Sequence, residues 1–171
     1  FSIILNITPD HLDRYITFEN YINSKGRIYL NQDEKDFIIY NEDDEIVRNL
    51  IQSARCKKLS FSLKGRVKEG IFVEDGVVKV FYNGKETKII DTNKISIKGK
   101  HNLYNSMAAS LAGFISGMKV NEIVNTLINF EGVEHRLEFV KEINGVKFYN
   151  DSKATNVDSV WYALDSFNEP I

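Results

Sequence analysis

The stretch DFIIYNEDDEIVRNLIQSARCKKLSF, residues 36–61, decides the fold because it alternates two kinds of hydrophobic pattern. Residues 36–40 and 58–61 are short apolar runs typical of strands, and residues 44–54 between them have helical spacing. A strand, a helix and a second strand in this order are typical of a mostly parallel sheet flanked by helices. The stretch therefore predicts an α/β fold.

The residues before this stretch predict the same architecture. Residues 1–7 indicate a buried strand, which Pro9 ends because proline cannot donate a hydrogen bond to a sheet. An amphipathic helix follows, with its apolar side chains at helical spacing. These side chains are Phe18, Tyr21, Ile22, Ile28 and Tyr29.

The pattern changes after Gly70. Residues 70–97 are short β-rich runs separated by Asp-Gly and Asn-Gly pairs, which predict a small antiparallel meander. Helices are then predicted from about Asn102 to Met118 and over 121–128, followed by a hairpin over 136–149 and a helix from Thr155. The polar segment before the hairpin is the predicted boundary between a domain over 1–131 and the start of a second over 132–171.

Composition excludes several classes of protein. The 171 residues are 43% hydrophobic, which is sufficient for a packed core. The 22 basic and 24 acidic residues give a net charge of −2, so we expect no nucleic-acid partner. A single cysteine and the lack of a long apolar run favour the cytoplasm and no membrane partner. We expect a monomer. Because the chain begins within a strand pattern and without Met, we expect it to be a fragment.

The first candidate site is NITPDHLDRY, residues 6–15. Asp10, His11, Asp13 and Arg14 lie just past the end of the first predicted strand, where open α/β sheets bind their ligands. The alternative is a turn in which Asp10 caps a local helix and Arg14 pairs with Asp13.

Lys25 is the second candidate, because it lies in the middle of the apolar stripe of the predicted helix, four residues after Tyr21. Its ammonium either extends into solvent, as long cationic side chains usually do, or is desolvated. Desolvation would lower the pKa of the amine and increase its neutral, nucleophilic fraction, which a carbamate-forming lysine requires. The local pattern favours the solvated alternative.

The third candidate is GKHNLYN, residues 99–105. Asn102 and Asn105 lie three residues apart at the expected start of a helix, whose free N–H groups suit an anion or a polar ring. The alternative is an asparagine N-cap. Near the predicted domain boundary, Arg136 could bind a phosphate through its guanidinium group.

The fourth candidate is YNDSKATNVDS, residues 149–159. Thr155 at a helix start, with Lys153 two residues earlier, could hold a carboxylate or a phosphate. Asp151 would instead accept hydrogen bonds from hydroxyl groups. The alternative is a capping box formed by Thr155 and Asp158, which leaves Asp151 and Lys153 without a role.

Together these stretches resemble the Mur ligases, and within that family the enzymes that add D-glutamate. The matching motifs keep the order that they have in the family and cover nearly the whole chain, and NDSKATN carries the assignment to D-glutamate. They are LNITPDHLDRY (5–15), SKGRIY (24–29), GKHNLYN (99–105), GVEHRLEFV (132–140) and NDSKATN (150–156).

The resemblance implies an ATP-dependent ligase of peptidoglycan synthesis. Its substrate UDP-N-acetylmuramoyl-L-alanine attacks the γ-phosphate of ATP through a carboxylate, and the amine of D-glutamate then attacks the resulting acyl phosphate. Two Mg²⁺ ions neutralise charge in this phosphoryl transfer. The implied fold is the later part of a central ATP-binding domain followed by the first hairpin and helix of a Rossmann-like C-terminal domain that binds D-glutamate.

The resemblance also implies a role for particular residues at the metal site. His11 matches a Mg²⁺ ligand. Lys25 matches a lysine that CO₂ carbamylates, which would convert a partly desolvated amine into the oxygen donor that Mg²⁺ prefers.

At the nucleotide, Asn105 matches a residue that contacts adenine, and Asn102 matches a residue that supports this contact. Arg136 and Asp151 match residues at the phosphates and the ribose of the nucleotide. Thr155 matches a contact to D-glutamate, and Lys153 is expected beside D-glutamate or the acyl phosphate.

The chain departs from the family in one respect, because it contains no phosphate loop of the form GxxGK[TS]. The resemblance places that loop before Phe1, and we therefore expect the chain alone to be inactive. Two alternatives remain open, namely a Mur-type ligase for another amino acid and a non-catalytic nucleotide-binding module with the same fold.

Overall fold

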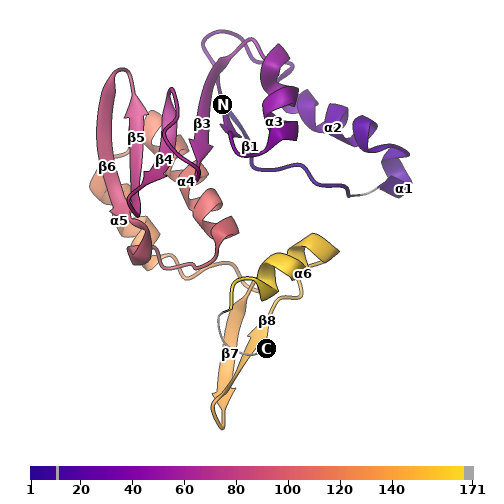
Figure 1. Ribbon diagram of the computed structural model, residues 1–171, viewed down its shortest axis with the longest axis vertical. Helices are drawn as coiled ribbons and strands as arrows, with labels where there is room; N and C mark the ends of the chain where they lie inside the picture. The colour runs from indigo at the N-terminus through magenta and orange to yellow at the C-terminus, as the bar shows by residue number, and fades with distance from the viewer. Residues whose placement is uncertain (11, 168–171) are drawn as a thin grey trace.

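The computed structural model describes residues 1–10 and 12–167, and its main element is a six-stranded sheet (Figure 1). The strands follow each other across the sheet in chain order. They are β1 (Ser2–Ile4), β2 (Phe37–Asn41), β3 (Lys57–Ser62), β4 (Gly70–Glu74), β5 (Val77–Tyr82) and β6 (Lys85–Asp91). Strands β1 to β4 are parallel, and β4, β5 and β6 are antiparallel. The predicted parallel sheet and its small meander are confirmed.

Helices cover both faces of this sheet. They are α1 (Leu12–Tyr15), α2 (Phe18–Gly26), α3 (Glu45–Leu50), α4 (Lys100–Ile115) and α5 (Val120–Asn129), with 3₁₀ helices η1 (Arg27–Tyr29), η2 (Ile51–Ser53) and η3 (Thr92–Lys94). Ile38 and Ile39 are fully buried and point to opposite faces, as successive strand residues do. Ile38 packs with Val47 of α3, whereas Ile39 packs with Met107 of α4. The predicted α/β class is thereby confirmed.

Gly70 lies where the sheet changes from parallel to antiparallel pairing. Its φ is +142°, and a Cβ added there would lie 1.8 Å from the carbonyl oxygen of Ser60 on β3. Any side chain would therefore separate β3 from β4, so glycine is needed for this approach of the two backbones.

The first strand is shorter than predicted: β1 ends at Ile4, whereas the sequence predicted a strand up to Ile7. The Ile7 N–H donates to the Asp44 carboxylate, 3.2 Å away, instead of to a neighbouring strand. The same carboxylate accepts from the Val47 N–H at 3.0 Å and so caps α3. Asp44 therefore joins the segment after β1 to the helix after β2.

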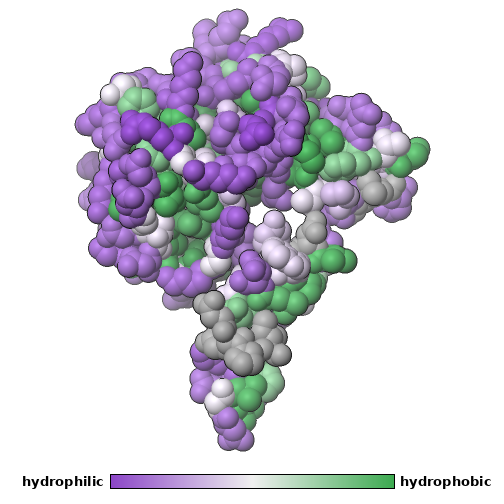
Figure 2. All heavy atoms as spheres, in the orientation of Figure 1, coloured by the Kyte–Doolittle hydropathy of each residue, from purple (hydrophilic) through white to green (hydrophobic). Residues whose placement is uncertain are grey.

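The last part of the chain forms β7 (Glu138–Ile143), β8 (Val146–Asn150) and α6 (Val157–Leu164), and the two strands make a separate sheet. Asn144 and Gly145 have positive φ in the hairpin turn, as predicted. The hairpin extends away from the main sheet, and hydrophobic atoms lie on its surface (Figures 1 and 2). Phe139 is 54% exposed and Phe148 46%. The domain boundary after residue 131 stays a prediction.

None of the helices in the described part of the chain is both long and apolar enough to span a membrane.

Candidate functional site

A cleft of about 870 Å³ opens where the parallel strands end. Asp10 after β1, Asp43 after β2 and Lys64 after β3 line one side, whereas the start of α4 and the segment around α6 line the other. Ligands of open α/β sheets bind at this edge, and the volume suits a small molecule. The cleft is therefore the candidate site.

Four of the predicted site residues line this cleft together, although they come from three separate segments. Asn105 belongs to α4, Arg136 precedes β7, and Asp151 and Lys153 follow β8. The prediction that these segments face a common ligand is thus compatible with their positions, and the role of each residue stays a prediction.

Two hydrogen bonds from backbone N–H groups join the segment that carries Arg136 to the segment that carries Asp151. The Asp151 carboxylate accepts from the Leu137 N–H at 3.2 Å, and the Lys153 N–H donates to the His135 carbonyl at 3.1 Å. His135 and Leu137 have φ values of 64° and 46°, which such residues seldom adopt. Arg136 thus lies between two strained residues held by hydrogen bonds to the segment after β8.

Asn102 and Asn105 differ in what they face. Helix α4 begins at Lys100, so both asparagines lie inside the helix and the N-cap alternative is wrong for each. The position before the helix belongs to Gly99, with a φ of 96°. The Asn102 side chain donates to the Lys98 carbonyl at 2.7 Å, whereas Asn105 lines the cleft.

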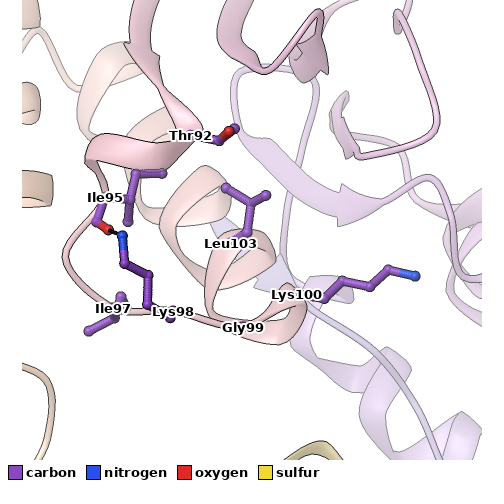
Figure 3. Close-up of a pocket in the computed structure, with 7 residues that line it drawn as sticks. All are labelled: Thr92, Ile95, Ile97, Lys98, Gly99, Lys100 and Leu103. Carbon is purple, nitrogen blue, oxygen red and sulfur yellow. Dashed lines mark hydrogen bonds between the residues drawn. The ribbon is translucent and has the colours of Figure 1, made fainter. Parts of the chain in front are cut away.

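A smaller hollow of about 210 Å³ lies beside the start of α4 (Figure 3). Lys98 lines it, and its ammonium donates to the carbonyls of Ile95 at 2.6 Å and of Asn93 at 3.1 Å. Lys100 points away from this hollow and also lines the cleft. The backbone therefore already binds the ammonium of Lys98.

His101, which we did not predict as a site residue, lines the cleft. Its ring centroid lies 5.9 Å from that of Tyr162 on α6. Burial lowers the pKa of His101 below its ordinary value, and the positive charge of Arg136 lowers it further. The neutral imidazole is thus favoured at this contact between α4 and α6.

Asp43 is a second residue that sequence reasoning missed. Its carboxylate accepts from the Ser62 hydroxyl at 2.7 Å, the Leu63 N–H at 2.8 Å and the Tyr104 hydroxyl at 2.7 Å. Burial acts to raise the pKa of Asp43, but these three hydrogen bonds outweigh it and hold the pKa below the ordinary value. Asp43 is therefore a carboxylate whose oxygens already have donors.

A signal for Asp43 exists in the sequence. The run Asn41-Glu42-Asp43-Asp44 directly follows a predicted strand, just as Asp10 does. The argument that selected Asp10 applies equally to this run. Tyr162, which lines the cleft beside His101, has no comparable pattern in the sequence around it.

Lys25 is exposed near the end of α2, with its ammonium 5.0 Å from the ring centroid of Tyr21. The partial desolvation expected for this amine is therefore wrong, and the solvated alternative describes it. The apolar stripe does not enclose Lys25, because α2 ends at Gly26 and Ile28 is 51% exposed. Tyr21 lines the cleft, whereas Lys25 is not among the described residues that line it.

His11 lies outside the described residues, so its predicted role as a metal ligand stays a prediction. Among residues 1–10 and 12–167, no three His, Cys, Asp or Glu side chains converge as a metal site. The only part of the predicted metal site that the structure describes is thus Lys25.

Thr155 is exposed and precedes the cap of α6. The cap is Asn156, whose side-chain oxygen accepts from the Ser159 N–H at 2.8 Å and from the Ser159 hydroxyl at 2.7 Å. The capping box with Thr155 as the cap is therefore wrong, because the residue that caps α6 is the next one, Asn156. Asn156 lines the cleft, and the role of Thr155 at D-glutamate stays a prediction.

The amino-acid sequence is similar to that of several curated ligases. The UDP-N-acetylmuramoylalanine--D-glutamate ligase of Thermoanaerobacter sp. (strain X514) is 49% identical over 170 residues, which is 99% of this chain and 37% of that protein. The ligase of the same name from Caldicellulosiruptor bescii is 45% identical over 98% of this chain and 37% of that protein. The chain thus spans little more than a third of the length of these relatives.

Solved structures share the fold. The MurF structure from Acinetobacter baumannii has a TM-score of 0.76 at 20% identity, over 97% of this chain and 37% of that one. A pseudomurein peptide ligase type C from Methanothermus fervidus has a TM-score of 0.71 at 21% identity, over 97% of this chain and 40% of that one. The family model for the Mur ligase middle domain matches residues 1–113, and the chain therefore belongs to the Mur ligase family.

Proposed function

We propose that this chain acts within a ligase that joins D-glutamate to UDP-N-acetylmuramoyl-L-alanine, with ATP as the energy source, in peptidoglycan synthesis. The proposal is supported by relatives of that name that are 45–49% identical over nearly the whole chain. Because the chain spans 37% of their length, the activity belongs to a protein that also has the remaining parts. The chain alone is expected to be inactive, and the complete ligase to be a cytoplasmic monomer.

The observation that carries the proposal is the composition of the cleft. Asn105 offers a side-chain amide that suits the polar edge of adenine, and Asp151 offers a carboxylate that suits ribose hydroxyls. Arg136 and Lys153 offer cations that suit phosphates. One cleft thus supplies groups for each part of ATP, with Asn102 supporting the start of α4 through the Lys98 carbonyl.

The proposed reaction has two steps. A carboxylate oxygen of UDP-N-acetylmuramoyl-L-alanine attacks the γ-phosphorus of ATP, and the bond to ADP breaks to give an acyl phosphate. The neutral amine of D-glutamate then attacks the acyl carbon, phosphate leaves, and the nitrogen loses a proton. Arg136 would bind the phosphates of ATP. Thr155 would contact D-glutamate, and Lys153 would lie beside D-glutamate or the acyl phosphate, in a unit formed by residues 132–171 beside the nucleotide unit of residues 1–131.

For the metal we propose His11 and carbamylated Lys25 as ligands of Mg²⁺. The position of Lys25 beside Tyr21, which lines the cleft, supports this part, together with the resemblance to the family. A carbamate would turn the exposed ammonium into an anionic oxygen donor, which Mg²⁺ prefers. When bound, the metal would supply positive charge to the phosphates during transfer.

The acceptor assay of the complete ligase tests the proposal. Phosphate release is measured with ATP and, in turn, D-glutamate, L-lysine, meso-diaminopimelate and D-alanyl-D-alanine, each with UDP-N-acetylmuramoyl-L-alanine and with UDP-N-acetylmuramoyl peptides of greater length. Turnover with D-glutamate is the expected result, and turnover with another acceptor instead would assign the protein to a different Mur-type ligase. Absence of turnover with every acceptor would favour a non-catalytic nucleotide-binding module.

A further inference from the structure

Asp43 and Tyr104 line the cleft and connect three elements of the fold, and this connection has no part in the proposed chemistry. Asp43 follows β2, and its carboxylate binds the Ser62 hydroxyl and the Leu63 N–H at the end of β3. The Tyr104 hydroxyl of α4 donates to the same carboxylate at 2.7 Å, across 61 residues of chain. The carboxylate therefore fixes α4 to the ends of two parallel strands.

Tyr104 is held at both ends of its side chain. Its ring centroid lies 6.0 Å from that of Phe61 on β3, which is fully buried, while its hydroxyl binds Asp43. Burial, followed by the Asp43 carboxylate, raises the pKa of Tyr104 well above its ordinary value, so the phenol remains a donor at neutral pH. A hydrogen bond to a carboxylate is stronger than one between neutral groups.

Tyr104 precedes Asn105, and both residues line the cleft. A helix that is free to turn about its axis would move the Asn105 amide relative to the strand ends, since neighbouring residues lie about 100° apart around a helix. Burial of Met107 and Leu111 holds the middle of α4 on the sheet, and the contacts of Tyr104 with Asp43 and Phe61 hold its beginning. The backbone that carries Asn105 is thus held directly beside an anchored residue.

We propose that Asp43 and Tyr104 are positioning residues that give the nucleotide site its preference for adenine, by holding Asn105 against the 6-amino edge of the base. The proposal rests on the proposed function, in which Asn105 binds adenine. Asp43 and Tyr104 act through Asn105 and do not take part in phosphoryl transfer.

The test measures base preference in the complete ligase with ATP and with ITP, whose base carries a carbonyl oxygen in place of the 6-amino group. The ratio of kcat/KM for ATP to kcat/KM for ITP does not depend on how much of a variant is folded. We expect Tyr104→Phe and Asp43→Asn each to lower this ratio about three- to tenfold, as expected for loss of a charge-assisted hydrogen bond. Asn105→Ala should lower the ratio at least as much, and KM for D-glutamate should stay unchanged.

Tyr40→Phe is the matched control. Its hydroxyl also donates to a carboxylate at 2.7 Å, that of Glu42, but Tyr40 is not among the described residues that line the cleft. This variant should keep the wild-type ratio.

Three outcomes would overturn the inference. An unchanged ratio in Tyr104→Phe, with the wild type preferring ATP, would refute the positioning role alone. An equal fall of this ratio in Tyr40→Phe would show that loss of any partly buried tyrosine hydroxyl changes base preference through packing, without a specific role of Tyr104. A wild type equally active with ATP and ITP would refute the adenine contact of Asn105 and with it the inference. Inactivity of the wild type with D-glutamate would instead refute the proposed function itself.

Discussion

The side-chain nitrogen of Asn156 lies 3.4 Å from a carboxylate oxygen of Asp10, which is 146 residues earlier in the chain. The oxygen of the same amide caps α6 by accepting from the Ser159 N–H. One side chain therefore both begins a helix and contacts the loop after β1, on the opposite side of the cleft.

Replacing Asn156 should separate these two effects. Asn156→Ala removes the cap, which costs about 1 kcal/mol of helix stability, so amides of α6 should exchange with solvent about fivefold faster. Asn156→Ser retains a good cap and loses the amide donor, so it should keep wild-type exchange within α6. Hydrogen exchange followed by mass spectrometry measures both variants. Equal protection in Asn156→Ala and the wild type would contradict the assignment of the cap.

The Asp43 carboxylate should make the free energy of unfolding depend on pH in the acidic range. Because the folded pKa lies below the ordinary value of 3.8, the stabilisation is fully present above pH 3.8 and is lost as the pH falls through the folded value. The free energy of unfolding of the wild type should therefore exceed that of Asp43→Asn near neutrality, and the gap should narrow below pH 3.8. Urea denaturation across this range measures the gap. Asp75→Asn, in a hairpin turn with a φ of 51° that asparagine also adopts, is the control and should leave the profile unchanged.

Gly70→Ala should be among the most damaging single substitutions in the chain. A Cβ placed 1.8 Å from the Ser60 carbonyl oxygen cannot be accommodated without separating β3 from β4, so we expect a loss of more than about 4 kcal/mol in the free energy of unfolding. Gly84→Ala is the matched control, because Gly84 also has a positive φ of 73° but no atom within 4 Å of the added Cβ. It should cost about 1 kcal/mol. Similar losses in the two variants would show that strain of φ, and not the contact, is decisive.

The ring of His101 should titrate below its ordinary pKa of 6.5, because burial and then the charge of Arg136 lower the pKa. Arg136→Ala should raise the pKa of His101 without restoring it to 6.5, since burial is the larger cause. Titration of the imidazole followed by NMR measures both values. A His101 pKa that returns fully to 6.5 in the variant would show that charge, rather than burial, dominates.

Lys25→Ala should abolish most of the turnover of the complete ligase, because it removes the proposed carbamate ligand. Added short carboxylates such as formate or acetate should partly restore turnover by supplying the missing oxygen donor. Lys57→Ala is the matched control, since Lys57 is also an exposed lysine whose ammonium lies 5.3 Å from an aromatic ring centroid, that of Phe37. Unchanged turnover in Lys25→Ala would end the proposed role at the metal.

Much of the fold was predictable because its signals are local. Short apolar runs located β2 and β3, and the Asp-Gly and Asn-Gly pairs located the turns of the meander. The start of α4 was missed by two residues because Gly99, and no capping side chain, precedes it. A positive φ at glycine leaves no side-chain signal of the kind that Ser, Thr, Asp or Asn provides.

The candidate site was predictable only in part. Asn105, Arg136, Asp151 and Lys153 do line one cleft, although their distances from one another depend on tertiary packing. For Lys25 the local pattern favoured a solvated ammonium, which the structure confirms, and only the resemblance to the family implied a partly desolvated one. Asp43 and Tyr104 were missed because their hydrogen bond spans 61 residues.

The order of strands in the main sheet has a consequence for biosynthesis. Because β1 to β6 are neighbours in chain order, each new strand can pair with one that has already left the ribosome. The loop that contains Asp10 must wait for Asn156, which is translated long after the sixth strand. The main sheet can thus form during translation before both sides of the cleft are present.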